Sequence, residues 1–181
     1  KVVLRVDAGG SSTLAAGSQC VTGGTGGLGL LTGRWLAQRG AHGLVLASRG
    51  GQHSTDARGC DWQQLSESTT RVVVERCDTA ETIEMRRLAQ RVRGALPALG
   101  GAWHAAGVLA DCVLAAQSAQ TLRRSLAPKA HGAWLLQRAA ATEQATSVLF
   151  SSVAALLGGG GQANYSAANS ALDALAKLRR Q

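Results

Sequence analysis

Short continuous apolar runs alternate along the chain with segments of helical periodicity. The runs predict strands over residues 18–22, 43–47, 71–75, 101–104 and 147–150. The apolar spacing between them predicts helices over 27–39, near 60–68, over 79–95, through 112–142 and from about 162 to the end. In the segment 79–95 one apolar face is spaced i, i+3, i+7 and i+11, through Met85, Leu88, Val92 and Leu96.

The order of these elements predicts the fold class. Strands that are apolar throughout belong to a sheet covered on both faces, and strands that alternate with helices form a parallel sheet. We therefore expect a Rossmann-type, doubly wound α/β fold. The length of 181 residues fits one domain with a substantial core, and no internal repeat is visible.

The first residues differ from the rest. Residues 1–6 predict a short strand, and residues 7–13 have the glycine and serine content of a linker. We predict a boundary here, with residues 1–17 as a linker or the end of a preceding domain and residues 18–181 as the main domain.

Composition and charge argue against several classes of protein. No apolar run approaches the ~20 residues of a membrane span, and no cleavable signal is visible at Lys1. The four cysteines are spaced too widely and irregularly for a zinc site or a disulfide framework, so we expect reduced thiols, no metal and a cytoplasmic protein with no membrane partner.

A net charge of +8 is compatible with a protein that binds polyanions. However, the arginines are scattered without interleaved aromatic residues, so an anionic cofactor and an acidic partner explain the charge at least as well, and we expect no nucleic acid partner.

Residues 22–29 hold five glycines in eight positions, between a predicted strand and a predicted helix. Glycine allows positive φ and close approach to a ligand, and the following helix directs free N–H groups toward a bound phosphate. The segment contains two overlapping dinucleotide-binding patterns, Gly24-x-Gly26-x-x-Gly29 and Thr22-Gly23-x-x-x-Gly27-x-Gly29. A flexible glycine linker is the alternative, which the flanking elements disfavour. The predicted cofactor-binding residues of this turn are Gly23, Thr25, Gly26, Gly27, Leu28 and Gly29.

The choice of dinucleotide depends on the end of the second strand. An acid there selects the free ribose hydroxyl of NAD, whereas an arginine accommodates the 2′-phosphate of NADP. This chain has Ser48 and Arg49, with no acid beside them. NADPH is therefore the predicted cofactor, unless Arg49 is only a solvated loop cation.

Two further strand ends complete the predicted cofactor site. Asp78 follows the third strand, where it is placed to contact the adenine or to cap helix 79–95 together with Glu81. After the fourth strand, Ala105, Ala106 and Gly107 provide either a small-residue floor for the ribose or ordinary close packing.

The predicted reaction centre follows the fifth strand. Ser152 precedes Tyr165 by thirteen residues, and Asn169 follows Tyr165 by four, on the same helix face. A tyrosine can protonate a carbonyl oxygen that gains a hydride, provided that a cation lowers its pKa from about 10. A serine hydroxyl can hold the same oxygen. Alternatively, Tyr165 is an interfacial aromatic residue.

These residues resemble the short-chain dehydrogenase/reductases and, within them, the ketoreductase domains of modular polyketide synthases. The resemblance covers residues 19–176, including His104-Ala105-Ala106-Gly107-Val108-Leu109 and Tyr165-Ser166-Ala167-Ala168-Asn169. Simple members carry their lysine four residues after the tyrosine, where this chain has Asn169. The segment 126–134 resembles the lysine motif of the synthase ketoreductases, which implies Lys129 as the cation and Asn169 as organiser of the helix and of a proton-relay water. Spacing alone suggests a surface lysine.

The resemblance implies NADPH-dependent reduction of a β-ketoacyl thioester on an acyl carrier protein, with neighbouring domains of a multienzyme as further partners. The alternatives are a fatty acid synthase ketoreductase of the animal type and a non-reducing NADP-binding scaffold or epimerase. The family's chirality marker keeps its last acid, Asp111, which could also cap a helix, and Leu157 stands where the opposite class has tryptophan. We expect the B-type, 3R (D) alcohol. We also expect that the last strands and lid helix of the family fold lie outside this sequence, which leaves a sheet edge exposed.

Overall fold

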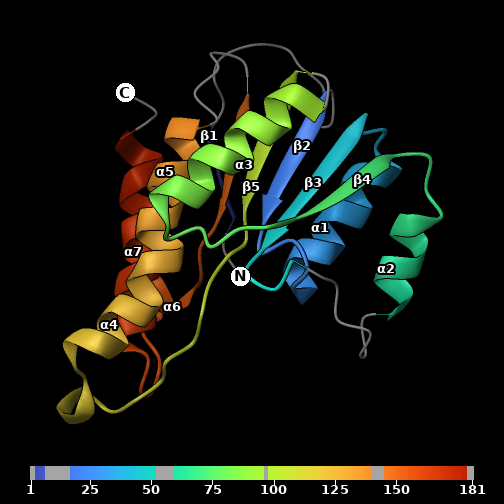
Figure 1. Ribbon diagram of the computed structural model, residues 1–181. Helices are drawn as coiled ribbons and strands as arrows, with labels where there is room; N and C mark the ends of the chain where they lie inside the picture. The colour runs from blue at the N-terminus through green and yellow to red at the C-terminus, as the bar shows by residue number, and fades with distance from the viewer. Residues whose placement is uncertain (1–2, 7–16, 52–58, 96–97, 140–144, 179–181) are drawn as a thin grey trace.

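A computed structural model describes residues 3–6, 17–51, 59–95, 98–139 and 145–178. Its centre is a six-stranded sheet with the order β1-β6-β5-β2-β3-β4 (Figure 1). The strands are β1 (Val3–Val6), β2 (Ser18–Thr22), β3 (Gly43–Ser48), β4 (Arg71–Arg76), β5 (Leu99–His104) and β6 (Thr146–Phe150). Strands β2 to β6 are parallel, as predicted, so their carboxyl ends share one edge of the sheet.

Helices cover both faces of the sheet, which explains why the strands are apolar throughout (Figure 1). On β2, Cys20 faces the core that contains α3 (Thr82–Ala95) and α5 (Gly132–Ala139). The next residue, Val21, faces the core that contains α1 (Gly27–Gln38) and α2 (Gly59–Ser66). A third cluster packs α7 (Ala163–Leu178) against α5 and β6.

The predicted helical region 112–142 is not one helix. It contains a 3₁₀ turn η1 (Leu114–Ala116), then α4 (Ala119–Leu126), a π-helical turn η2 (Ala127–His131) and α5. Ser118 caps α4, because its hydroxyl accepts from the N–H of Thr121. The suggestion that Asp111 caps a helix is therefore wrong, since it lies seven residues before this cap.

Other boundaries shift by a few residues. Helix α3 begins at Thr82 rather than at residue 79, because Asp78 and Glu84 close a turn before it. Asp78 Oδ1 accepts from the N–H of Ala80 at 3.0 Å, and Glu84 Oε2 accepts from the N–H of Asp78 at 2.7 Å. The capping partner is thus Glu84 and not Glu81. A short helix α6 (Ala154–Leu157), which the periodicity did not predict, follows β6.

The predicted strand at residues 1–6 is present as β1, which pairs antiparallel with β6 and places Val3 opposite Phe150. It therefore adjoins the main sheet. The domain boundary near residue 17 stays a prediction. None of the helices described in the structure is long and apolar enough to cross a membrane.

The glycine turn supplies a stability test. A Cβ at Gly29 would overlap the carbonyl oxygen of Gly23, so we expect Gly29→Ala to lower the free energy of unfolding by about 2 kcal/mol or more. Gly94, on α3, has open space around its added Cβ, and Gly94→Ala should stabilise by about 0.5–1 kcal/mol. Urea unfolding of both variants measures the contrast, and equal stabilities would show that the turn is not close-packed.

Candidate functional site

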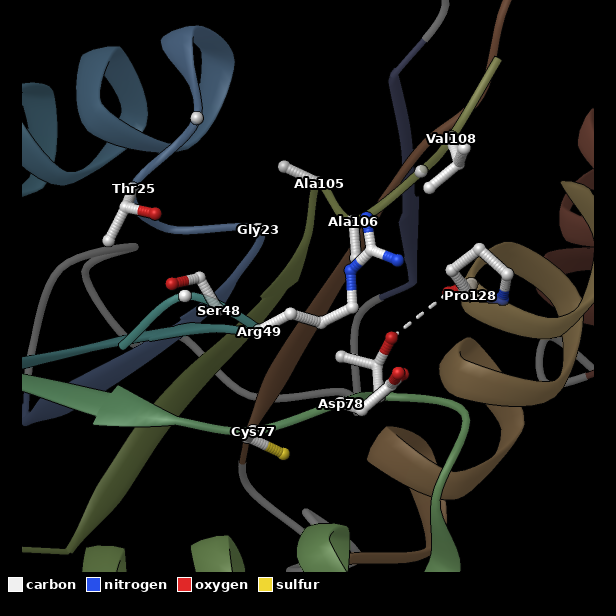
Figure 2. Close-up of a pocket in the computed structure, with 14 residues that line it drawn as sticks. Gly23, Thr25, Ser48, Arg49, Cys77, Asp78, Ala105, Ala106, Val108 and Pro128 are labelled. Carbon is white, nitrogen blue, oxygen red and sulfur yellow. Dashed lines mark hydrogen bonds between the residues drawn. The ribbon is translucent and has the colours of Figure 1, made fainter. Parts of the chain in front are cut away.

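A pocket of about 280 Å³ lies at the carboxyl ends of β2, β3, β4 and β5 (Figure 2). Strand β2 has β3 on one side and β5 on the other, so the chain reverses direction across the sheet at this point. Open α/β sheets bind ligands at such switch points. The lining residues are Gly23, Thr25, Gly26, Ser48, Arg49, Gly50, Cys77, Asp78, Thr79, Ala105, Ala106, Gly107, Val108 and Pro128.

The glycine turn provides one wall of this pocket. Gly23 has φ +68°, and a Cβ there would come within 2.8 Å of the backbone of Ala105. Gly26 is the N-cap residue of α1 and contributes no side-chain cap, and the first turn of α1 carries no acid. Backbone donors and the positive end of the helix dipole are therefore available to an anion.

Not every predicted residue of the turn lines the pocket. Gly27 begins α1 and is exposed, while Leu28 packs against the core on the α1 face. Gly29 is buried against Gly23 and Gly24. These three residues shape the turn and its junction with the helix, and their direct contact with a cofactor stays a prediction.

Arg49 extends from the end of β3 across the pocket toward Ala106 (Figure 2). Arg49 is exposed, and no acid accompanies it at the end of β3. The acid in the pocket lining is Asp78, which follows β4. The Ser48 carbonyl oxygen accepts from the N–H of Cys77 at 2.9 Å, which holds the ends of β3 and β4 together. A cation on a strand end fixed in this way can meet a ribose phosphate.

Asp78 both lines the pocket and stabilises the turn before α3, so its two predicted roles are compatible. Its neighbour Cys77 also lines the pocket. Burial, with smaller contributions from the charges of Glu84, Asp78 and Glu75, raises the pKa of the Cys77 thiol to about 11. The thiol is protonated near pH 7 and is not a nucleophile here.

Lys129 lies on η2 and is only 5 % exposed, so the surface position suggested by spacing is wrong. Its Nζ donates to the carbonyl oxygen of Phe150 at 3.0 Å and lies 5.4 Å from the centroid of the Tyr165 ring. The absence of a side chain at Gly107 makes room for it, since a Cβ there would lie 2.9 Å from Lys129 Cε. The structure thus brings together a cation and a phenol from different helices.

The remaining predicted catalytic residues come from the segment after β6 and from α7. Ser152 follows β6, and its Oγ accepts from the N–H of Ala154 at 3.3 Å. Asn169 Nδ2 donates to the carbonyl oxygen of Tyr165 at 2.8 Å, one turn back along α7. Its buried Oδ1 has no hydrogen-bond partner among the described residues, so this oxygen is available to a water molecule.

Asp111 and Leu157, the two predicted stereochemical markers, both lie on exposed segments. Gln162 Nε2 donates to Asp111 Oδ2 at 3.0 Å, and the N–H of Cys112 donates to the carbonyl oxygen of Gly161 at 2.9 Å. These bonds join the loop after β5 to the glycine-rich loop before α7. Leu157, at the end of α6, is 82 % exposed.

His104 is a buried residue of this region for which the sequence predicted no role. Its Nδ1 lies 2.7 Å from Thr22 Oγ1, and its Nε2 lies 3.0 Å from the carbonyl oxygen of Lys129. Burial and, secondarily, the charge of Lys129 lower the pKa of His104 to about 4. Its place at a strand end, directly before Ala105 and Ala106, was the available signal.

Comparison with known proteins identifies the family of this chain. The model of the KR domain matches residues 17–181. A spectinabilin polyketide synthase system protein, NorA, of Streptomyces orinoci is 40 % identical over 173 residues, 95 % of this chain and 9 % of the relative. The polyketide synthase GfsA of Streptomyces halstedii is 42 % identical over 167 residues, 91 % of this chain and 2 % of the relative.

A solved structure of A-type ketoreductases from a modular polyketide synthase superposes with a TM-score of 0.81 at 36 % identity, covering 94 % of this chain and 36 % of that one. The predicted Rossmann-type fold is confirmed as that of the short-chain dehydrogenase/reductases. The chain spans less than a tenth of the length of the two synthases above.

The buried imidazole predicts an acid-sensitive stability. The pKa of His104 is about 4 in the folded protein and about 6.5 when exposed, so unfolding takes up a proton between these values. The contribution of His104 is fully present above about pH 6.5 and falls by roughly 3 kcal/mol as the pH drops through 4. Urea unfolding of wild type and His104→Gln between pH 7 and pH 4 measures it, and the difference between the two curves separates His104 from the carboxylates. Parallel curves would contradict the prediction.

Proposed function

The chain belongs to the KR domain family, the ketoreductases of polyketide synthases, and we propose that it reduces a β-ketoacyl thioester on an acyl carrier protein with NADPH. The observation that carries this proposal is the buried Lys129 ammonium group, 5.4 Å from the Tyr165 ring centroid. An ammonium group so placed can stabilise the negative charge that the tyrosine oxygen gains when its proton passes to a forming alkoxide.

The residues present fit the proposed cofactor. The glycine turn leaves no space for a side chain at Gly23, and the pyrophosphate would be held by the backbone of this turn. Arg49 would meet the 2′-phosphate, Asp78 the adenine, and residues 105–107 the ribose next to the nicotinamide. When bound, NADPH supplies the hydride that the β-carbon receives.

The protein's own residues then protonate and bind the carbonyl oxygen of the substrate. Tyr165 donates its proton to this oxygen, and the Ser152 hydroxyl donates a hydrogen bond to it. Lys129 stabilises the phenolate that remains. Asn169 holds, through its buried Oδ1, a water that returns a proton toward Lys129 and Tyr165.

The stereochemical proposal depends on Asp111. Its retention, together with Leu157 in place of tryptophan, supports B-type reduction to the 3R (D) alcohol. The bond from Gln162 fixes the Asp111 carboxylate beside the loop that precedes Tyr165, where it can influence how a substrate enters. The A-type designation belongs to the solved relative and does not transfer at 36 % identity, so chiral separation of the product alcohol decides the configuration.

Carrier protein and neighbouring domains are part of the same proposal. The relatives are much longer than this chain, which supports a place within a multienzyme, and the charge of +8 suits an acidic partner. A fatty acid synthase would use the same chemistry. A non-reducing scaffold or epimerase would bind NADPH tightly without consuming it, and a polyanion binder would weaken steeply with salt.

Replacing the proton donor tests the proposed reaction. In the complete protein, Tyr165→Phe should lower kcat for a β-ketoacyl thioester roughly 10²- to 10⁴-fold, because the phenol proton is lost, while the Kd for NADPH is unchanged. NADPH consumption and binding measure the two quantities. Ser170→Ala, at an exposed position of the same helix, is the control and should match wild type. Undiminished turnover in Tyr165→Phe would refute the assignment.

Reversing the charge of Arg49 tests the cofactor. Arg49→Asp should raise the KM for NADPH about tenfold or more and improve the use of NADH, because an acid repels the 2′-phosphate and accepts from a free ribose hydroxyl. Arg87→Asp makes the same charge change at an exposed position of α3 and should alter neither constant. If both variants weaken NADPH equally, the effect is one of net charge and Arg49 does not select the cofactor.

A further inference from the structure

His104 connects two parts of the site that are distant in sequence. The ring is 0 % exposed and lies at the end of β5. On one side it contacts Thr22, the last residue of β2 before the glycine turn, and on the other it contacts the backbone of Lys129 on η2. A single side chain thus bridges the strand that leads into the cofactor turn and the turn that carries the catalytic cation.

The chemistry of its partners allows one protonation pattern. A carbonyl oxygen only accepts, so Nε2 of His104 carries the proton and donates to Lys129. Burial and the nearby ammonium keep the ring neutral. Nδ1 therefore has no proton and accepts from the hydroxyl of Thr22. Both ring nitrogens are satisfied, and the ring cannot rotate without losing both bonds.

Side chains from outside η2 hydrogen-bond to the backbone of this turn. A π-helical turn departs from the regular hydrogen-bond ladder of the helix. Two consecutive carbonyl groups of η2 accept from side chains near the carboxyl ends of the strands. Thr79 Oγ1 donates to the carbonyl oxygen of Pro128 at 3.3 Å, and His104 Nε2 donates to that of Lys129 at 3.0 Å. The hydrogen bond from His104 thus holds the backbone of Lys129 itself. A shift of this backbone would move the lysine side chain and displace Nζ from its bond with the carbonyl oxygen of Phe150.

We propose that His104 is a positioning residue for Lys129: as the neutral Nε2–H tautomer, it holds the lysine backbone so that the ammonium group meets Phe150 and Tyr165. It touches neither substrate nor cofactor in this role. The inference rests on the proposed reductase function for its kinetic consequence, although the positioning itself is independent of turnover.

Two substitutions separate the hydrogen bond from the packing of the ring. His104→Phe keeps a planar buried ring but removes the donor, and we expect kcat to fall roughly 10- to 100-fold with both KM values within about twofold of wild type. His104→Gln keeps one donor and one acceptor and cannot take up a proton near neutral pH, so kcat should stay within about threefold of wild type. Leu36→Ala, which opens a cavity on α1, is a control for lost stability and should leave kcat unchanged below its Tm.

A second measurement does not require activity. The Lys129 ammonium is buried and bonded, so its NMR signal should be protected from exchange in wild type and in His104→Gln and lost in His104→Phe. Protection that persists in His104→Phe, or equal losses of kcat in the Phe and Gln variants, would overturn the inference. If wild type shows no reduction of a β-ketoacyl thioester but the ammonium signal follows this pattern, the proposed function fails and the positioning role stands.

Discussion

The Lys129 ammonium group lies inside the protein, 3.0 Å from the carbonyl oxygen of Phe150 and 5.4 Å from the centroid of the Tyr165 ring. A charged group removed from water is costly unless polar partners replace its hydration. The carbonyl at the end of β6 is one such partner, and the face of the aromatic ring is another. Because these partners come from the carboxyl end of β6 and from α7, the lysine is stable in this position only when both elements are in place.

Two unusual features of the backbone lie next to the buried lysine. Gly107 has no side chain where the lysine stem passes, and the regular helix gives way to the π-helical turn η2 at Lys129. Irregular helical turns of this kind are frequent at functional sites. The departures from regular structure therefore lie close to the groups that would carry out the reaction, and the cores on either face of the sheet are built from regular elements.

The parallel sheet and most helices could be predicted from the sequence because each strand is covered on both faces. Cys20 and Val21 are adjacent in sequence but belong to different cores, which produces a continuous apolar run instead of an alternating one. The region 112–142 could not be predicted in the same way. Its break into α4, η2 and α5 depends on the cap at Ser118 and on side chains such as Thr79, which reaches η2 from before α3.

The sequence by itself determined the fold class and the strand ends that line the pocket, because apolar runs and glycine spacing are local properties. It also singled out Tyr165 and Asn169 as neighbours, since four residues make one helical turn. Only the tertiary structure decided that Lys129 is buried, that it lies beside Tyr165, and that His104 contacts its carbonyl oxygen. These contacts join residues from different elements, and no spacing along the chain specifies how far apart such elements lie once the sheet has formed.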